Sequence, residues 1–250
     1  MNDLQKFHAY RALLGSPADI RVHWWYVGTM LAHCPGLPPL PVIQATTLMV
    51  YRMETLNPTS FAIHWDEVGY FTDYVTGEPV TDWTNPLTGR TEQSPKNFKE
   101  GPACYIVTLN DAGLQIALDQ PGATIKSLDL EWSKQGKRIQ LVQTERKVRG
   151  FPDQDGNLPA PGSSSGFEAC TRLAFIGAPG DPGREFSQCH GIYDFQLAGL
   201  PPWLGFELND GRALVSGVIR KTSPDQPLHA RAGQILRSMY PGFFAEHVDA

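Results

Sequence analysis

The spacing of glycine and proline is the feature that most constrains how this chain can fold. The sequence holds 24 Gly and 21 Pro among 250 residues, and the segments between them are short and rich in β-branched and aromatic residues. Long helices do not persist between such breaks, whereas short strands joined by tight turns do. The sequence therefore predicts a chain built mostly of β-strands.

Strands are expected wherever apolar and polar residues alternate. The clearest case is the segment in which Leu128, Leu130 and Trp132 alternate with Asp129 and Glu131, so that one strand face is dry and the other solvated. Asn57-Pro58 predicts a hairpin. The segments with strand character are 23–30, 45–54, 60–72, 103–109, 128–132, 138–148, 167–176, 186–197 and 212–221.

Helices are expected only near the two ends. The first begins at Asn2 or Asp3 and stops at Gly15 and Pro17, and the second covers 229–240. The face of the first helix is expected to hold Leu4, Phe7, Arg11 and Leu14. The expected fold class is mainly β (α+β), a curved antiparallel sheet or lipocalin-like β-barrel with N-terminal and C-terminal helices, in a single domain over 1–250.

Charge and composition exclude several classes of partner. Lys and Arg total 21 against 26 Asp and Glu, with a net charge of -5 and no long block of one sign. A nucleic-acid partner would require a basic stripe, so none is expected. Charged residues interrupt the first thirty positions, so we expect no export signal, no membrane partner and a cytoplasmic location.

The sequence lacks the motifs that usually hold cofactors. It contains no G-x-G-x-x-G, no G-x-x-x-x-G-K-[ST] and no H-E-x-x-H, and its serine-rich match to G-x-S-x-G, Gly162–Gly166, lies in an expected loop rather than directly after a strand. The seven His are far apart, and Cys34, Cys104, Cys170 and Cys189 form no C-x-x-C pair, which predicts free thiols. We therefore expect neither a cofactor nor a metal, and the sequence leaves homo-oligomer formation open.

Two turn segments, 73–77 and 85–89, are built alike. Asp or Asn begins each turn, Thr offers a hydroxyl to the nearby backbone, and Gly takes a conformation that other residues avoid. Turn chemistry alone explains most of these residue types, so a structural role is favoured over a functional one.

The same block resembles the bacterial family catalogued as domain of unknown function 1838, whose members carry E-x-x-x-Y-x-D-x-x-T-G-E followed by W-x-N-P-x-T-G. The segments Trp25–Gly28 and Pro35-Gly36 resemble an upstream W-x-x-G element and its Pro-Gly loop. Many relatives begin with an export signal, which is not expected here, and the resemblance implies no activity. The matching positions are Glu67, Phe71, Asp73, Thr76, Gly77, Glu78, Trp83, Asn85, Pro86, Thr88 and Gly89.

Strand periodicity supplies the candidate catalytic residues, and each keeps two interpretations. His190 lies on a polar strand face that is either solvated or turned into a barrel lumen. Arg172 is either half of a cross-strand ion pair or an anchor for a carboxylate or phenolate, and His64 is either a surface residue or a base oriented by Asp66. The expected catalytic residues are His190, His64, Glu67, Arg172, Arg52 and Tyr105.

Tyr and Trp are more numerous than a core requires, which favours an aromatic guest molecule. Their polar atoms need partners when buried, and a polar ligand supplies such partners. The expected substrate-binding residues are Trp24, Trp25, Tyr26, Trp65, Tyr70 and Tyr193.

Exclusion of redox, phosphoryl and metal chemistry leaves catalysis by side chains. The sequence favours a cofactor-independent lyase or isomerase for a small aromatic or phenolic compound, in which His or Glu removes a proton while Arg and Tyr stabilise the anion. One alternative is a barrel that binds an apolar or aromatic metabolite without changing it. The other is an interaction subunit with no enclosed cavity.

Overall fold

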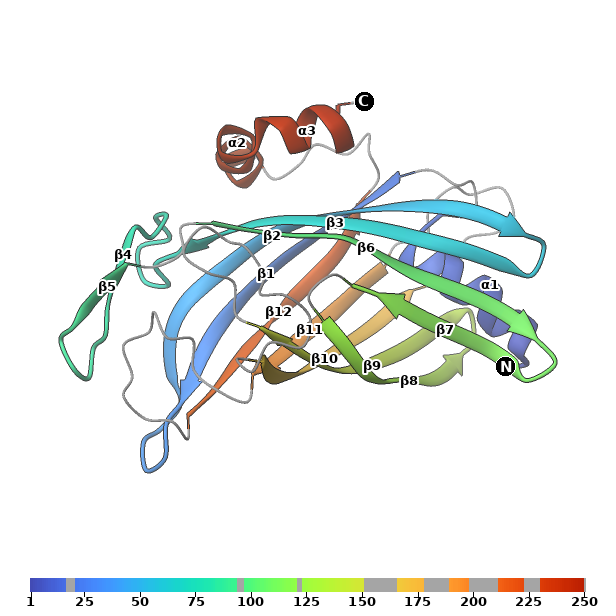
Figure 1. Cartoon of the computed structure of the whole chain (residues 1–250), viewed down its shortest axis with the longest axis horizontal. Coiled ribbons are helices and arrows are strands. Elements are labelled where there is room, and N and C mark those ends of the chain that lie inside the picture. Colours follow the sequence, from blue (N-terminus) through green and yellow to red (C-terminus); the bar gives the residue numbers. More distant parts are fainter. Residues whose placement is uncertain are drawn as a thin grey trace.

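The dominant feature of the computed structural model is a strongly curled antiparallel sheet of ten strands that forms a half-barrel (Figure 1). The structure describes residues 1–16, 21–93, 97–120, 123–150, 166–177, 189–197, 211–222 and 230–249. The ten strands are β1 (Arg21–His33), β2 (Leu40–Asn57), β3 (Ser60–Thr72), β6 (Asn97–Asn110), β7 (Gly113–Asp119), β8 (Ala123–Gln135), β9 (Arg138–Gly150), β10 (Gly166–Gly177), β11 (Cys189–Leu197) and β12 (Arg212–Thr222).

The strand order is that of a meander whose two ends meet. The order β7-β6-β3-β2-β1-β12-β11-β10-β9-β8 pairs each long strand with its neighbour in sequence, except that β7 and β8 are the two edges. The seam of the barrel therefore lies between β7 and β8, while the first and last strands, β1 and β12, are paired in the middle of the sheet. The predicted fold class, a curved antiparallel sheet with helices at both ends, is confirmed.

The strands of the ten-stranded sheet are generally longer than the sequence predicted, and one of these ten was missed. Strand β7 was not predicted, because its residues alternate weakly and none of them is fully buried. The predicted hairpin at Asn57-Pro58 is confirmed, since β2 and β3 pair directly on either side of it. In β8, Leu128, Leu130 and Trp132 pack against the core, so the predicted dry face is also confirmed.

Helix α1 (Asp3–Leu14) begins as predicted, but its buried face is broader than the predicted one and only partly overlaps it. Asn2 caps it, with its side chain accepting a hydrogen bond from the Gln5 backbone N–H, and the Gln5 side chain reciprocates. Phe7 and Leu14 of the expected face are buried, whereas the expectation was wrong at Leu4, which is 53% exposed. The buried residues of α1 are Phe7, Ala9, Tyr10, Leu13 and Leu14.

The buried face of α1 is broad because the helix packs against the concave side of the sheet, where several strands contact it. The Phe7 ring lies 5.0 Å from the ring of Phe61 in β3, and the Tyr10 ring lies 6.5 Å from that of Trp132 in β8. A helix surrounded in this way buries more than one narrow stripe.

The C-terminal end of α1 is fixed by two buried side chains. Lys221 of β12 donates from Nζ to the carbonyl oxygens of Ala12, Leu13 and Gly15, at 2.6, 3.0 and 3.0 Å. Trp24 of β1 donates from Nε1 to the carbonyl of Leu14 at 2.9 Å. These donors satisfy carbonyls that have no partner within the helix, and the ammonium complements the helix dipole.

Helices α2 (Ala230–Met239) and α3 (Pro241–His247) lie against the convex face of the sheet, above β2 and β3 in Figure 1. The predicted closing helix over 229–240 corresponds to α2. None of the described helices has the length and apolar character needed to cross a bilayer. The buried residues that join this pair of helices to the sheet are Leu48, Val50, Val68, Tyr70, Leu236, Phe243 and Phe244.

The two similar segments form similar turns, as the sequence predicted. The Asp73 carboxylate accepts hydrogen bonds from the backbone of Val75 and Thr76 at 3.0 and 2.7 Å, and Gly77 has φ of 70°. The Asn85 side chain does the same for the two corresponding residues at 2.8 and 3.1 Å, and Gly89 has φ of 71°. Turn geometry therefore accounts for these Asp, Asn, Thr and Gly residues.

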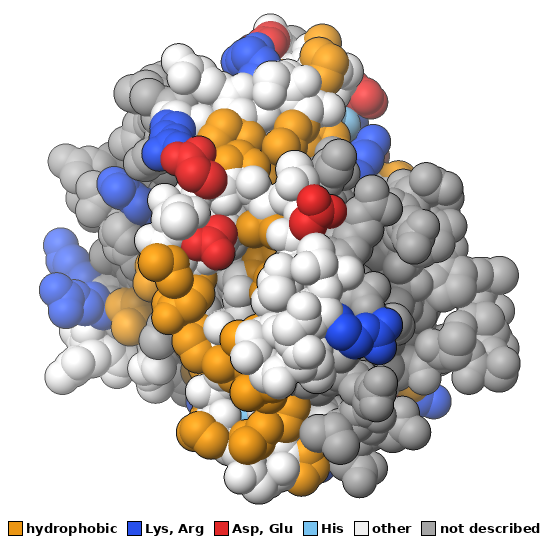
Figure 2. Space-filling model, turned by 90° about the vertical axis from the view of Figure 1, so that its left-hand side faces the viewer, with side chains coloured by type: hydrophobic (Ala, Val, Ile, Leu, Met, Phe, Trp, Pro, Cys, Tyr) orange, Lys and Arg blue, Asp and Glu red, His pale blue; other side chains and the backbone are white. Residues whose placement is uncertain are grey.

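The second of these turns connects β4 (Asp82–Thr84) to β5 (Thr91–Gln93), and the first precedes β4 along the chain. The two strands form a small second sheet that projects from one end of the molecule (Figure 1). Seen from that end, hydrophobic side chains gather in patches between a few charged ones (Figure 2). Tyr74, Val75 and Leu87 in the adjoining turns are 50%, 75% and 52% exposed.

Candidate functional site

A group of polar side chains is buried on the concave side of the half-barrel. We call it the interior polar cluster: Tyr10, Tyr105, Gln120, Gln143, Glu145 and Lys147. None of these residues is more than 5% exposed. Burial of polar and charged groups is costly unless they are paired, so a cluster of this kind requires explanation.

Glu145 is at the centre of the cluster. Its Oε1 accepts hydrogen bonds from the Tyr105 hydroxyl at 2.6 Å and from Gln143 Nε2 at 2.5 Å, and Gln143 Oε1 in turn accepts from the Tyr10 hydroxyl at 2.8 Å. Tyr105 is in β6 and Glu145 in β9, on opposite sides of the β7–β8 seam. The Tyr105–Glu145 hydrogen bond therefore bridges the concave interior.

Lys147 provides the positive charge of the cluster. Its Nζ lies 3.8 Å from Glu145 Oε2 and donates a hydrogen bond of 2.8 Å to Gln120 Oε1. Gln120 Nε2 lies at 3.5 Å from a carboxylate oxygen of Glu100. A buried Lys–Glu pair is stable only when additional hydrogen bonds satisfy it, and these amides supply them.

The tyrosines of this region are held in their neutral form. Burial, together with the nearby Glu145 carboxylate, raises the pKa of Tyr10, Tyr51 and Tyr105 well above the usual value for a phenol. At neutral pH they are consequently hydrogen-bond donors rather than bases. The carboxylate of Glu145 is the group in the cluster that can accept a proton.

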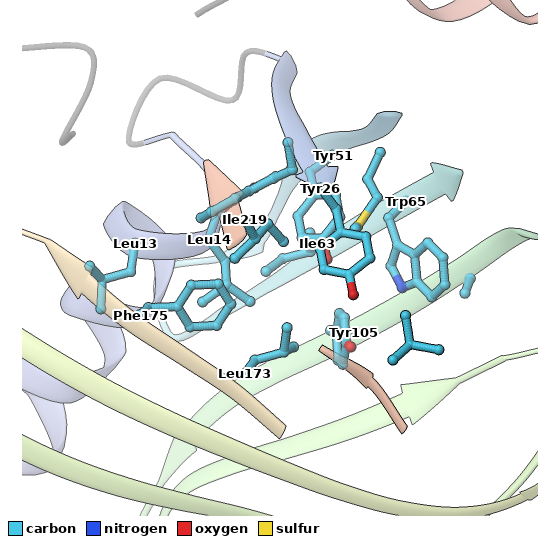
Figure 3. Packing of buried hydrophobic residues seen from close by; sticks show 14 of the residues in the cluster. Leu13, Leu14, Tyr26, Tyr51, Ile63, Trp65, Tyr105, Leu173, Phe175 and Ile219 are labelled. Carbon is cyan, nitrogen blue, oxygen red and sulfur yellow. The ribbon is translucent and has the colours of Figure 1, made fainter. Parts of the chain in front are cut away.

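Two buried polar atoms beside the cluster have no hydrogen-bond partner among the described residues: Nε1 of Trp65 and Oγ1 of Thr171. Thr171 is directly opposite Glu145 in the β9–β10 register. Trp65 is opposite Tyr51, and their rings are 6.4 Å apart. Figure 3 shows the hydroxyl ends of Tyr51 and Tyr105 and the indole nitrogen of Trp65 turned toward one interior region.

The structure places five of the predicted residues on this side of the sheet. Tyr105, Trp65, Tyr26 and Trp24 belong to the interior core, although Trp24 Nε1 is already bonded to α1. Glu67 is opposite Met49, another residue of that core. These residues do not include a histidine or an arginine.

Other predicted residues lie on the convex face, so the structure does not bring the expected catalytic group together. Arg172 is exposed and alternates with buried Thr171 and Leu173, so its side chain lies on the face of the sheet that does not hold Glu145. Trp25 and Tyr70 pack with α2 and α3. The expectation that Arg172, Trp25 and Tyr70 face a lumen was wrong, because one-residue alternation does not reveal which face is inside.

His64 and Arg52 do meet, but in a pocket on the convex face. The Nε2 atom of His64 lies 2.8 Å from Oε2 of Glu54, whereas the sequence predicted Asp66 as the carboxylate that orients this histidine. His190 is opposite Ile176 and Arg220 in the sheet, while its side chain and that of Tyr193 lie outside the described residues. The Gly-, Pro- and Ser-rich segment 150–166, whose composition predicts a long loop, also lies almost entirely outside the described residues.

Sequence reasoning missed Glu145, Gln143, Lys147 and Tyr10. A signal was present, because Ile139 and Leu141 share strand parity with Gln143, Glu145 and Lys147. The apolar pair marks that parity as the inner one, so the three polar residues that follow had to be buried. Tyr10 gave no comparable signal, since its burial depends on where α1 docks.

The described cavities are lined with charged residues. One of about 600 Å³ includes Arg146, Lys147, Arg212 and Lys126, and another of about 340 Å³ includes Arg21, Arg52 and His64. No group of three His, Cys, Asp or Glu side chains among the described residues is arranged to hold a metal ion. Cys34, Cys104 and Cys170 are free thiols, as predicted for these three.

Fold and site together define an antiparallel half-barrel with a buried carboxylate–phenol cluster. Comparison with family models, curated proteins and solved structures found no match. The resemblance to the family catalogued as domain of unknown function 1838 stays a prediction. Most of the residues that carry this resemblance lie in or beside the two turns 73–77 and 85–89.

Proposed function

We propose that the chain is a cofactor-independent acid–base enzyme, a lyase or isomerase, that acts on a small aromatic or phenolic compound bound on the concave side of the half-barrel. The observation that carries the proposal is the buried Glu145 carboxylate, held by Tyr105 and Gln143 beside two buried donors without a described partner. Buried polar atoms are rarely left unpaired unless a ligand or water completes them.

Glu145 is the proposed general base. Both hydrogen bonds that orient it end on Oε1, which leaves Oε2 to receive a proton from a carbon acid, with Lys147 at 3.8 Å stabilising the charge. In an isomerase the protonated Glu145 returns that proton to a different carbon of the same substrate. In a lyase the electron pair released from the C–H bond expels a leaving group instead.

The unpartnered donors have a matching role. Proton removal beside a carbonyl moves negative charge onto the carbonyl oxygen, and preorganised donors stabilise that charge best. The Trp65 N–H and the Thr171 hydroxyl supply such donors without first breaking a hydrogen bond to another described residue. The rings of Tyr51 and Trp65 provide apolar surface for an aromatic guest.

Hydrogen–deuterium exchange of a substrate carbon tests the proposal. A panel of phenolic ketones such as para-hydroxyphenylacetone is incubated with the protein in deuterated buffer and followed by NMR. We expect catalysed exchange that falls by about a hundredfold or more in Glu145→Gln, whose amide keeps the shape of the site but is not a base. The control Glu131→Gln changes an exposed carboxylate on β8 and should exchange at the wild-type rate.

A non-catalytic binding protein is the second candidate. It is favoured by the raised pKa values of Tyr10, Tyr51 and Tyr105, which leave no activated phenol in the cluster. On this alternative, phenolic compounds raise the melting temperature of the wild-type protein while no panel member exchanges. Exchange by Glu145→Gln at the wild-type rate would remove Glu145 from any catalytic role.

A further inference from the structure

A second site, independent of the interior cluster, lies on the convex face between the sheet and α3. We call it the α3 pocket: a cavity of about 340 Å³ whose charged wall consists of Arg21, Arg52, His64, Asp66, Glu246 and His247. This volume is at the lower end of the range for small-molecule sites. The predicted pair Arg52 and His64 belongs to this pocket and not to a barrel lumen.

Strand register places the basic residues of the pocket in one row. Arg21 of β1 is directly opposite Arg52 of β2, and Arg52 is directly opposite His64 of β3. Like charges at directly opposite positions repel and destabilise a sheet. Neighbouring guanidinium groups offset this repulsion when they share an anion, and their planar forks match the geometry of a carboxylate.

The acidic side chain next to this row, Glu54, is paired with the histidine. Glu54 lies 2.8 Å from His64 Nε2, whereas no described side chain bonds the exposed guanidinium of Arg52. Arg52 can therefore bind an external anion without giving up an internal ion pair. Arg21, Arg52 and His64 together form the basic side of the pocket wall.

The opposite charge is also built into the wall. Asp66 of β3 and Glu246 of α3 line the same cavity, and His247 Nε2 lies 3.6 Å from the Glu246 carboxylate. Two carboxylates beside two guanidiniums repel a polyanion such as a nucleotide. They match a ligand that carries one negative and one positive group. Val50 and Pro102 add an apolar part to the wall.

We propose that the α3 pocket binds a small zwitterion of the size of a free α-amino acid, with its carboxylate at Arg21 and Arg52 and its ammonium group at Asp66 and Glu246. The apolar part of the wall accommodates an aliphatic side chain. Because Glu246 and His247 come from α3, the bound ligand joins the C-terminal helix to three strands of the sheet. Binding should consequently raise the melting temperature.

The test begins with isothermal titration of the wild-type protein with the common L-amino acids at low ionic strength, using leucine and its two truncated analogues as the matched set. Isocaproate lacks the ammonium group of leucine, and isoamylamine lacks its carboxylate. We expect an aliphatic amino acid such as leucine to bind, and each analogue to bind at least about tenfold more weakly.

Variants then locate the site. Arg52→Gln and Asp66→Asn should each weaken amino-acid binding by about tenfold or more. Arg220→Gln and Asp129→Asn remove the same charges from exposed positions outside the pocket and should leave the affinity unchanged. Arg52 is exposed, so its replacement should preserve the fold, which the melting temperature verifies.

Three results would overturn the proposal. They are no binding of any amino acid to the wild-type protein, equal affinity for leucine and isocaproate, and wild-type affinity in Arg52→Gln. None of these measurements involves Glu145, so the outcome is separate from that of the exchange experiment.

Discussion

His23 is a buried histidine whose protonation opposes folding. It is 2% exposed in β1, and burial, reinforced by the positive charge of Arg21, lowers its pKa from 6.5 to about 4. Below pH 6.5 the unfolded chain takes up a proton at His23 that the folded chain takes up only near pH 4. The free energy of unfolding therefore decreases as the pH falls through this window.

We expect this one residue to account for a loss of about 2 kcal/mol between pH 7 and pH 4.5. Urea unfolding at both pH values measures it, and His23→Gln should show a correspondingly smaller loss than the wild-type chain. His8→Gln changes an exposed histidine of α1 and serves as the control. An equal loss in His23→Gln and the wild type would assign the acid sensitivity to other groups.

At the level of elements, the attachment of α1 depends on Lys221. Its ammonium group is 5% exposed and bonds three carbonyls at the end of the helix. Lys221→Met keeps the length of the side chain but leaves these buried carbonyls unsatisfied. We expect a loss of about 3 kcal/mol in the free energy of unfolding.

Chemical denaturation measures this loss, with Lys134→Met on β8 as the control at an exposed position. The control should change stability by no more than about 0.5 kcal/mol. If Lys221→Met were as stable as the control, the hydrogen bonds at the end of α1 would contribute little to holding the helix in place.

The elements were predictable from sequence to the extent that their signals are local. Alternation in 128–132, the turn residues Asp73 and Asn85, and the cap at Asn2 each depend on a few adjacent residues, and each prediction was confirmed. The buried face of α1 was predictable only in part, at Phe7 and Leu14, because the burial of Tyr10 and Leu13 depends on strands that are distant in sequence.

The candidate site was predictable only in part for the same reason. Tyr105 was identified, but its partner Glu145 lies 40 residues away and meets it across the seam. Arg172 was assigned to the wrong side, since a strand has two faces and only the assembled sheet decides which is inside. Register, not residue type, separated the interior cluster from the α3 pocket.

The whole molecule is a barrel that is left open along one line, and this should be visible in its dynamics. The edges β7 and β8 contain no fully buried residue, whereas β2 in the middle of the sheet contains Ile43 and Leu48, which are 0% exposed. Edge strands with little buried apolar surface open locally at a lower free energy than central ones.

Hydrogen–deuterium exchange read by mass spectrometry tests this difference. We expect peptides that cover β7 and β8 to exchange at least about tenfold faster than peptides that cover β1 and β2. Equal protection would mean that the seam is closed, either by pairing of β7 with β8 or by another chain. Tyr105 and Glu145 lie in β6 and β9, the strands next to these edges. Local opening of β7 and β8, which fast exchange would reveal, would therefore also provide a route by which a guest molecule reaches the interior polar cluster.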